Sequence, residues 1–140
     1  MQIKKILVPV DGSEYSLKAA RYAADFSKLV GAELVLLNCR MQVPPMLSAE
    51  AYEQAKESLV RRADELLNPF RELLRGAGVT FSAKIMEGPV EDAIIELADF
   101  EKCDLIIMGS RGHSELEGLL VGSTTHRVLQ IAACPVTVVR

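Results

Sequence analysis

Short apolar runs alternate along this chain with longer amphipathic segments. Four runs of strand length are almost continuously apolar, at residues 5–10, 33–37, 105–108 and 136–139, and a weaker fifth run at 80–86 alternates apolar and polar positions. Continuous runs are typical of strands that are covered on both faces. The sequence therefore predicts five strands in a largely buried sheet.

The segments between these runs have helical periodicity. A first helix is predicted between Ser13 as N-cap and Gly31 as C-terminal stop. Its inward face is predicted to comprise Tyr15, Ala19, Tyr22, Ala23, Phe26 and Val30. A second helix is predicted over about 48–75, and Pro69 should kink or divide it.

Two further helices complete the alternation. One should open at Gly88-Pro89, with the proline at the first helical position, and the other should run from about Ser123 to Ala132. Strands and helices in alternation imply an α/β fold, a Rossmann-like parallel sheet with helices on both faces. The length predicts a single domain over residues 1–140. Ligands of such sheets bind outside the carboxyl ends of the strands, beside the first strand, where the strand order reverses.

Composition narrows the classes of partner and compartment. The chain has 16 Lys and Arg against 19 Asp and Glu, a net charge of −3, which disfavours nucleic acid and anionic membranes as partners. Cys39, Cys103 and Cys134 lack the spacing of a zinc site or a disulfide framework, so we expect free thiols in a reducing compartment. Apolar stretches are too short for a secretory signal or a membrane span, and we expect a cytoplasmic protein.

A glycine-rich segment follows the fourth strand. Its glycines and the hydroxyl residues after them are Gly109, Gly112, Gly122, Ser123, Thr124 and Thr125. Glycine lets a backbone approach a phosphate closely, and the free N–H groups of the helix that begins here would suit an anion. An ordinary surface loop with turn glycines is the alternative. The spacing is neither a Walker A loop, since no lysine follows Gly122, nor the dinucleotide GxGxxG pattern.

Charged residues near these strand ends allow two interpretations. Asp11 follows the first strand, and its carboxylate either contacts a ligand or shapes the Asp-Gly-Ser turn. Arg111 either neutralises a phosphate or is a solvated loop residue. His113 and His126 have no acidic or cysteine partner at metal-ligand spacing, which favours solvated surface histidines.

Four parts of the chain together form a specific pattern. They are the glycine skeleton Gly109, Gly112 and Gly122-Ser123, the opening at residues 4–16, the segment at 87–90 and the close at 134–139. This compound pattern resembles the ATP-binding universal stress protein family over essentially the whole chain. The resemblance implies a doubly wound sheet of five parallel strands in the order 3-2-1-4-5. It also implies a homodimer and bound ATP.

The resemblance further implies roles for individual residues. Those it places at the adenosine end are Pro9, Val10, Asp11 and Cys39, the last through its backbone. Those it places at the ribose and the first phosphate are Met108, Gly109, Arg111 and Gly112. Those it places at the outer phosphates are Gly122, Ser123, Thr124 and Thr125, with Mg²⁺ or Mn²⁺ bridged through the phosphates rather than by protein ligands. Family members often have valine where Thr124 stands and a bulkier aliphatic residue where Cys39 stands.

Two classes of function are consistent with this pattern. The first is a regulatory nucleotide-binding homodimer in the stress response, and the alternative is a slow ATPase or phosphotransferase. Hydrolysis needs a positioned base, and Glu115 and Glu117 are interpreted as solvated loop charges, which favours the first class. The last strand should lie at a sheet edge, where its free backbone groups would pair with a second copy. Its residues are Val136, Thr137, Val138 and Val139.

Overall fold

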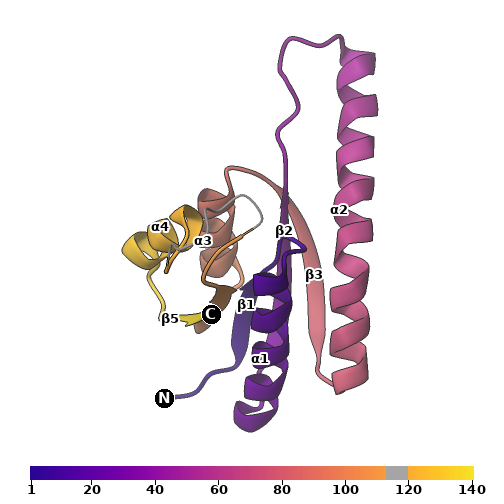
Figure 1. Ribbon diagram of the computed structural model, residues 1–140. Helices are drawn as coiled ribbons and strands as arrows, with labels where there is room; N and C mark the ends of the chain where they lie inside the picture. Colours follow the sequence, from indigo (N-terminus) through magenta and orange to yellow (C-terminus); the bar gives the residue numbers. More distant parts are fainter. Residues whose placement is uncertain (113–119) are drawn as a thin grey trace.

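Strands and helices alternate in the computed structural model, which describes residues 1–112 and 120–140 (Figure 1). In chain order the elements are β1 (Lys5–Pro9), α1 (Glu14–Val30), β2 (Glu33–Arg40), α2 (Ala49–Ala77), β3 (Phe81–Glu87), α3 (Val90–Phe100), β4 (Leu105–Gly109), α4 (Ser123–Ile131) and β5 (Val136–Val139). Every pair of neighbouring strands is parallel, and the order is β3-β2-β1-β4-β5. This confirms the doubly wound sheet, whose order reverses between β1 and β4.

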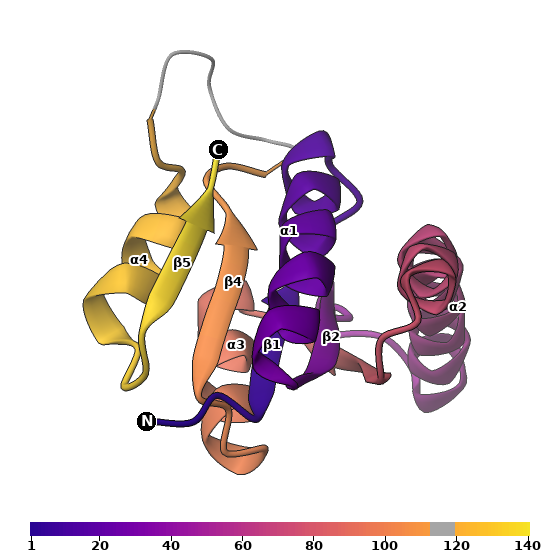
Figure 2. The same ribbon diagram turned by 90° about the horizontal axis from the view of Figure 1, so that it is seen from below.

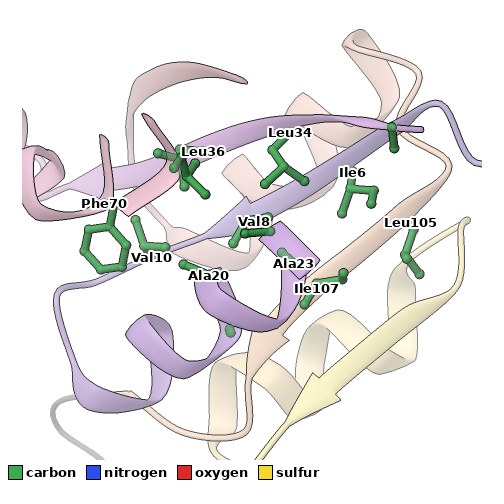
Figure 3. Close-up of a cluster of buried hydrophobic side chains, with 14 of the residues drawn as sticks. Ile6, Val8, Val10, Ala20, Ala23, Leu34, Leu36, Phe70, Leu105 and Ile107 are labelled. Atoms are coloured by element: carbon green, nitrogen blue, oxygen red, sulfur yellow. The ribbon is translucent and has the colours of Figure 1, made fainter. Parts of the chain in front are cut away.

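Helices cover both faces of the sheet. α1 and α2 lie against one face, and α3 and α4 lie against the other (Figure 2). Alternate residues of β1 therefore enter different apolar clusters: Ile6 and Val8 pack with α1 and α2, whereas Leu7 packs with α3 and α4. Figure 3 shows the first cluster, to which α1 contributes Ala20 and α2 contributes Phe70. The continuous apolar runs of β1, β2 and β4 thus belong to strands buried on both faces, as predicted, whereas β5 is only half-buried.

Small side chains bring α1 close to the sheet. The Oγ atom of Ser13 caps the helix by accepting a hydrogen bond from the N–H of Ser16 (3.2 Å), and Gly31 ends it at a φ of 74°. Both ends agree with the sequence prediction. The inward face differs in part, because Tyr22 and Val30 are exposed. The buried residues are Ser16, Ala19, Ala20, Ala23, Ala24 and Ser27. Their small size lets the helix axis approach the strands, which larger side chains would prevent.

α2 is one continuous helix despite its internal proline. The interpretation that Pro69 divides it is wrong. Both Pro69 and Glu65 are exposed, so the carbonyl group of residue 65 that loses its helical partner lies on the solvent side, where water can satisfy it. The buried residues of α2 are Ala63, Leu67, Phe70 and Leu74, and the helix begins beyond the sheet (Figure 1). No helix in the described ranges, α2 included, has the length and apolar composition needed to cross a membrane.

Two of the differences from the predicted element boundaries have a clear local cause. β2 continues to Arg40 rather than ending at residue 37. The polar Asn38 can stay within the buried strand because its Nδ2 atom donates a hydrogen bond to the carbonyl of Val10 (2.8 Å). α3 begins one residue later than predicted, because Pro89, joined to Gly88 by a cis peptide bond, is its N-cap residue and not its first helical residue.

Candidate functional site

A pocket of about 230 Å³ opens at the carboxyl ends of β1 and β4. These strands are neighbours, and the strand order reverses between them, which is where doubly wound sheets bind ligands. The residues that line it are Pro9, Val10, Asp11, Ser16, Leu37, Asn38, Cys39, Val90, Ile94, Met108, Gly109, Arg111, Gly112, Thr124 and Thr125. Of the site residues predicted from the sequence, Gly122 and Ser123 lie outside this lining and all others belong to it.

The turn after β1 brings Asp11 to the pocket wall. The N–H of Val10 donates to the carbonyl of Leu37 (2.8 Å), and the Val10 carbonyl accepts from Asn38, so both backbone groups of Val10 are fixed to β2. The Oδ1 atom of Asp11 accepts a hydrogen bond from the N–H of Ser13 (2.9 Å). This confirms that Asp11 shapes the turn. Its place in the lining also allows the carboxylate to contact a ligand.

The end of β4 touches the start of α1. A Cβ atom on Gly109 would lie 2.9 Å from the carbonyl carbon, the carbonyl oxygen and the Cβ atom of Tyr15. Close packing leaves no room for such a contact, so the approach of α1 by itself requires glycine here. The next residue, Ser110, donates its N–H to the carbonyl of Val139 (2.8 Å), and its carbonyl accepts from the N–H of Gly122 (2.6 Å). The glycine segment is thereby anchored to β5 and to α4.

The start of α4 adjoins the pocket. Gly122 is the N-cap residue, and the helix begins at Ser123, whose side chain is exposed. The Oγ1 atom of buried Thr125 donates a hydrogen bond to the carbonyl of Gly109 (2.8 Å), which ties the helix start to the end of β4. Because Thr124 and Thr125 line the pocket, the first turn of the helix, where N–H groups suit an anion, lies beside it.

Arg111 is half-buried at the pocket wall. Its Cζ atom lies 4.6 Å from the centroid of the Tyr15 ring, a distance typical of a cation–π contact. Its Nε atom is buried and has no hydrogen-bond partner among the described residues. None of the ion pairs among the described residues includes Arg111. The interpretation of Arg111 as a solvated loop residue is therefore wrong, since its guanidinium packs on a ring.

Part of the pocket lining, here called the apolar wall, is made of Cys39, Ile94 and Met108. The Sγ atom of Cys39 donates a weak hydrogen bond to the carbonyl of Val90 (3.9 Å), at the start of α3. Burial, with a smaller contribution from the Glu91 carboxylate, raises the pKa of the Cys39 thiol to about 12. The thiol is therefore protonated near neutral pH and adds to an apolar surface rather than acting as a nucleophile. Ile94 and Met108 belong to the same wall and the same apolar cluster.

Of the remaining titratable candidates, the structure describes only His126. His126 is exposed on α4, in agreement with the solvated interpretation. His113, Glu115 and Glu117 fall within 113–119, outside the described residues. In residues 1–112 and 120–140, no group of three or more His, Cys, Asp or Glu side chains is arranged to hold a metal ion.

Comparison with known proteins places the whole chain in one family. Residues 2–140 match the model of the universal stress protein family. Universal stress protein MJ0531 of Methanocaldococcus jannaschii is 36% identical over 140 residues, which cover 98% of this chain and 82% of that protein. A universal stress protein of Thermus aquaticus is 33% identical over 138 residues, which cover 98% of each chain. The chain belongs to the universal stress protein family.

Solved structures of universal stress proteins share the fold. Protein MJ0577 of Methanocaldococcus jannaschii superposes with a TM-score of 0.89 at 30% identity, covering 99% of this chain and 96% of that chain. A universal stress protein in complex with cAMP superposes with a TM-score of 0.77 at 25% identity, covering 100% of this chain and 99% of that chain.

Part of the pocket of this universal stress protein is not evident from its sequence. The lining residues that the sequence prediction missed are Ser16, Leu37, Asn38, Val90 and Ile94. Leu37 and Asn38 carry a usable signal, because they directly precede Cys39 at the end of the neighbouring strand. Val90 and Ile94 carry none, because the packing of α3 over β2 is a tertiary arrangement.

Proposed function

We propose that this chain binds an adenine nucleotide, with ATP as its main ligand, and acts as a regulatory module in the cytoplasmic stress response. The observation that supports this best is one pocket whose lining combines apolar side chains with an arginine packed on an aromatic ring. Ligand pockets are typically apolar with a few placed polar groups. The relative in complex with cAMP supports adenine as the base.

The proposed pose follows the chemistry of the lining. Adenine would lie against Val10, Met108 and the backbone of Cys39, with the ribose beside Asp11 and near Pro9. The residues proposed for the phosphates are Gly109, Arg111, Gly112, Gly122, Ser123, Thr124 and Thr125. These residues fit an anion because they combine a cation with a helix start. Mg²⁺ or Mn²⁺ would be bridged through the phosphates.

Calorimetric titration with ATP, AMP, cAMP and adenosine in the presence of Mg²⁺ tests the proposal. We expect Arg111→Ala to weaken ATP and leave adenosine unchanged, since the guanidinium would meet phosphate only. Arg127→Ala removes an exposed arginine of α4 outside the lining and is the matched control. A folded parent protein that binds none of these ligands would contradict the proposal. A single-turnover incubation with ATP would reveal hydrolysis, the alternative function.

We also propose that the functional unit is a homodimer joined through β5 (Val136–Val139). This strand pairs with β4 and is the last strand in the sheet order, so one of its edges faces outward. An apolar, β-branched edge strand favours pairing with another chain, and a two-fold arrangement closes at two copies. The dimer would join two nucleotide pockets through one sheet.

A further inference from the structure

The ring of Tyr15 packs against the guanidinium of Arg111, although Tyr15 itself lies outside the pocket lining. The Cζ atom of Arg111 is 4.6 Å from the centroid of the Tyr15 ring, whereas only Arg111 of this pair lines the pocket. We infer that Tyr15 is a positioning residue that holds Arg111 ready for the phosphate of a nucleotide, and so sets the preference for nucleotides over nucleosides. This inference rests on the proposed function.

The ring is mounted on fixed backbone. Tyr15 lies in the first turn of α1, whose start is capped by Ser13. Its backbone packs so closely on Gly109 that a Cβ atom there would be only 2.9 Å away. α1 therefore has no room to move closer to β4 at this point, which fixes the Cα of Tyr15 beside the end of the strand.

The backbone that leads to Arg111 is anchored as well. Ser110, the preceding residue, is buried. Its N–H donates to Val139 of β5 (2.8 Å) and its carbonyl accepts from Gly122 (2.6 Å). Ring and guanidinium thus approach each other from two elements that the fold holds in place.

The contact suits the guanidinium for binding a phosphate. A guanidinium stacked on a ring uses its face for the contact and keeps its edge N–H groups for an anion. Holding the long arginine side chain before the ligand arrives lowers the entropy lost on binding. The Nε atom of Arg111 is buried without a partner among the described residues, which is unfavourable until an anion approaches. Nucleosides would gain nothing from this arrangement.

Two substitutions of Tyr15 distinguish the contribution of its aromatic face from that of its size. Tyr15→Phe keeps the aromatic face, and Tyr15→Leu keeps a large apolar side chain without it. We expect Tyr15→Phe to match the parent in calorimetry. Tyr15→Leu should weaken ATP by about 3- to 30-fold, the range that a cation–π contact supports, with adenosine unchanged. In an Arg111→Ala background, Tyr15→Leu should cause no further loss of ATP affinity.

A second measurement examines the contact without ligand. The Nε–H resonance of Arg111 should show an aromatic ring-current shift in the parent and in Tyr15→Phe, and should lose it in Tyr15→Leu. Equal ATP affinity in the parent and in Tyr15→Leu would overturn the inference and leave the proposed function standing. Equal losses for ATP and adenosine in a folded Tyr15→Leu protein would show a merely structural role and overturn it too. A parent that binds neither ligand would overturn the proposed function, and the inference with it.

Discussion

Gly112 faces the carboxylate of Asp11 so closely that a Cβ atom on it would lie 2.5 Å from the Oδ2 atom. The other oxygen, Oδ1, accepts a hydrogen bond from the N–H of Ser13 (2.9 Å). Gly112 does not have the positive φ that would itself require glycine. Glycine is therefore needed at position 112 to make room for the Asp11 carboxylate, and not to allow a special backbone conformation.

Gly112→Ala should weaken nucleotide binding with little loss of stability. The tip of Asp11 can move aside, so we expect unfolding free energy within about 1 kcal/mol of the parent. If Asp11 contacts the ribose, both ATP and adenosine should lose about 1.5–3 kcal/mol of binding free energy. Gly76→Ala is the matched control, because nothing lies within 4 Å of an added Cβ atom on that residue of α2. It should add about 0.5–1 kcal/mol of stability and leave binding unchanged. Parent-like affinity in Gly112→Ala would exclude a ligand role for Asp11.

Asn38→Ala should destabilise the protein at the pocket floor. The variant deprives the Val10 carbonyl of the Nδ2 donor at 2.8 Å in a buried setting, which should cost about 1–3 kcal/mol. Asn68→Ala is the control, since exposed Asn68 only accepts a hydrogen bond from Arg71 on the surface of α2. It should cost less than about 0.5 kcal/mol. Urea denaturation compares the two variants, and equally small losses would mean that the buried hydrogen bond contributes no net stability.

Ser123→Ala should weaken the binding of ATP but not that of adenosine. Ser123 is the exposed first residue of α4, where a phosphate would receive its hydroxyl and the N–H groups of the helix start. A hydrogen bond to a charged group is worth about 1.5–3 kcal/mol, so ATP should bind about 10- to 150-fold more weakly while adenosine is unaffected. Ser58→Ala, on α2, is the control. Similar losses for both ligands in Ser123→Ala would place the serine away from the phosphates.

The Cys39 thiol should make stability fall at alkaline pH. Its pKa rises from an ordinary value of 9.0 to about 12, mainly because the group is buried. The protonated thiol contributes its full stabilisation of the folded state below pH 9. Because the thiol of the unfolded chain ionises first, this stabilisation is lost as the pH rises from 9 toward 12. The slope for this group is about 1.4 kcal/mol per pH unit. Denaturation of the parent and of Cys39→Ala over this pH range separates the contribution of the thiol from that of the lysines, which both proteins share. Identical alkaline slopes would show that the thiol is not the cause.

The apolar runs and caps of this chain were sufficient to predict its elements and a parallel sheet covered on both faces, whereas the strand order was predicted from the family resemblance. Apolar runs located all five strands, and Ser13 and Gly31 marked both ends of α1. These signals are local, because they depend on a few neighbouring residues. The inward face of α1 was less predictable, because small residues are favoured at the buried positions only when the helix packs closely against the sheet. Pro69 shows the same limit, because an exposed proline interrupts one hydrogen bond without ending the helix.

The site was predictable where it follows the strand ends. Asp11 and the segment from Gly109 to Gly112 lie in the pocket because parallel strands end at one edge of the sheet. The packing of Arg111 on Tyr15 could not be foreseen, because it depends on how closely α1 approaches β4. Likewise, the sequence offers no means to tell a glycine that faces a ligand from one that faces Tyr15, as Gly109 does.

Val138→Pro should convert the proposed homodimer to a monomer. β4 donates from Ile106 to the carbonyl of Pro135 and from Ser110 to that of Val139. Because backbone groups alternate along a parallel strand, the N–H of Val138 points to the free edge of β5, whereas that of Thr137 points to β4. Val138→Pro therefore removes an outward donor only, which edge strands tolerate. Thr137→Pro, the control, breaks the pairing with β4 and should lower stability itself. Light scattering after size exclusion measures the mass. A parent that is already monomeric at high micromolar concentration, or a dimeric Val138→Pro, would contradict assembly through β5.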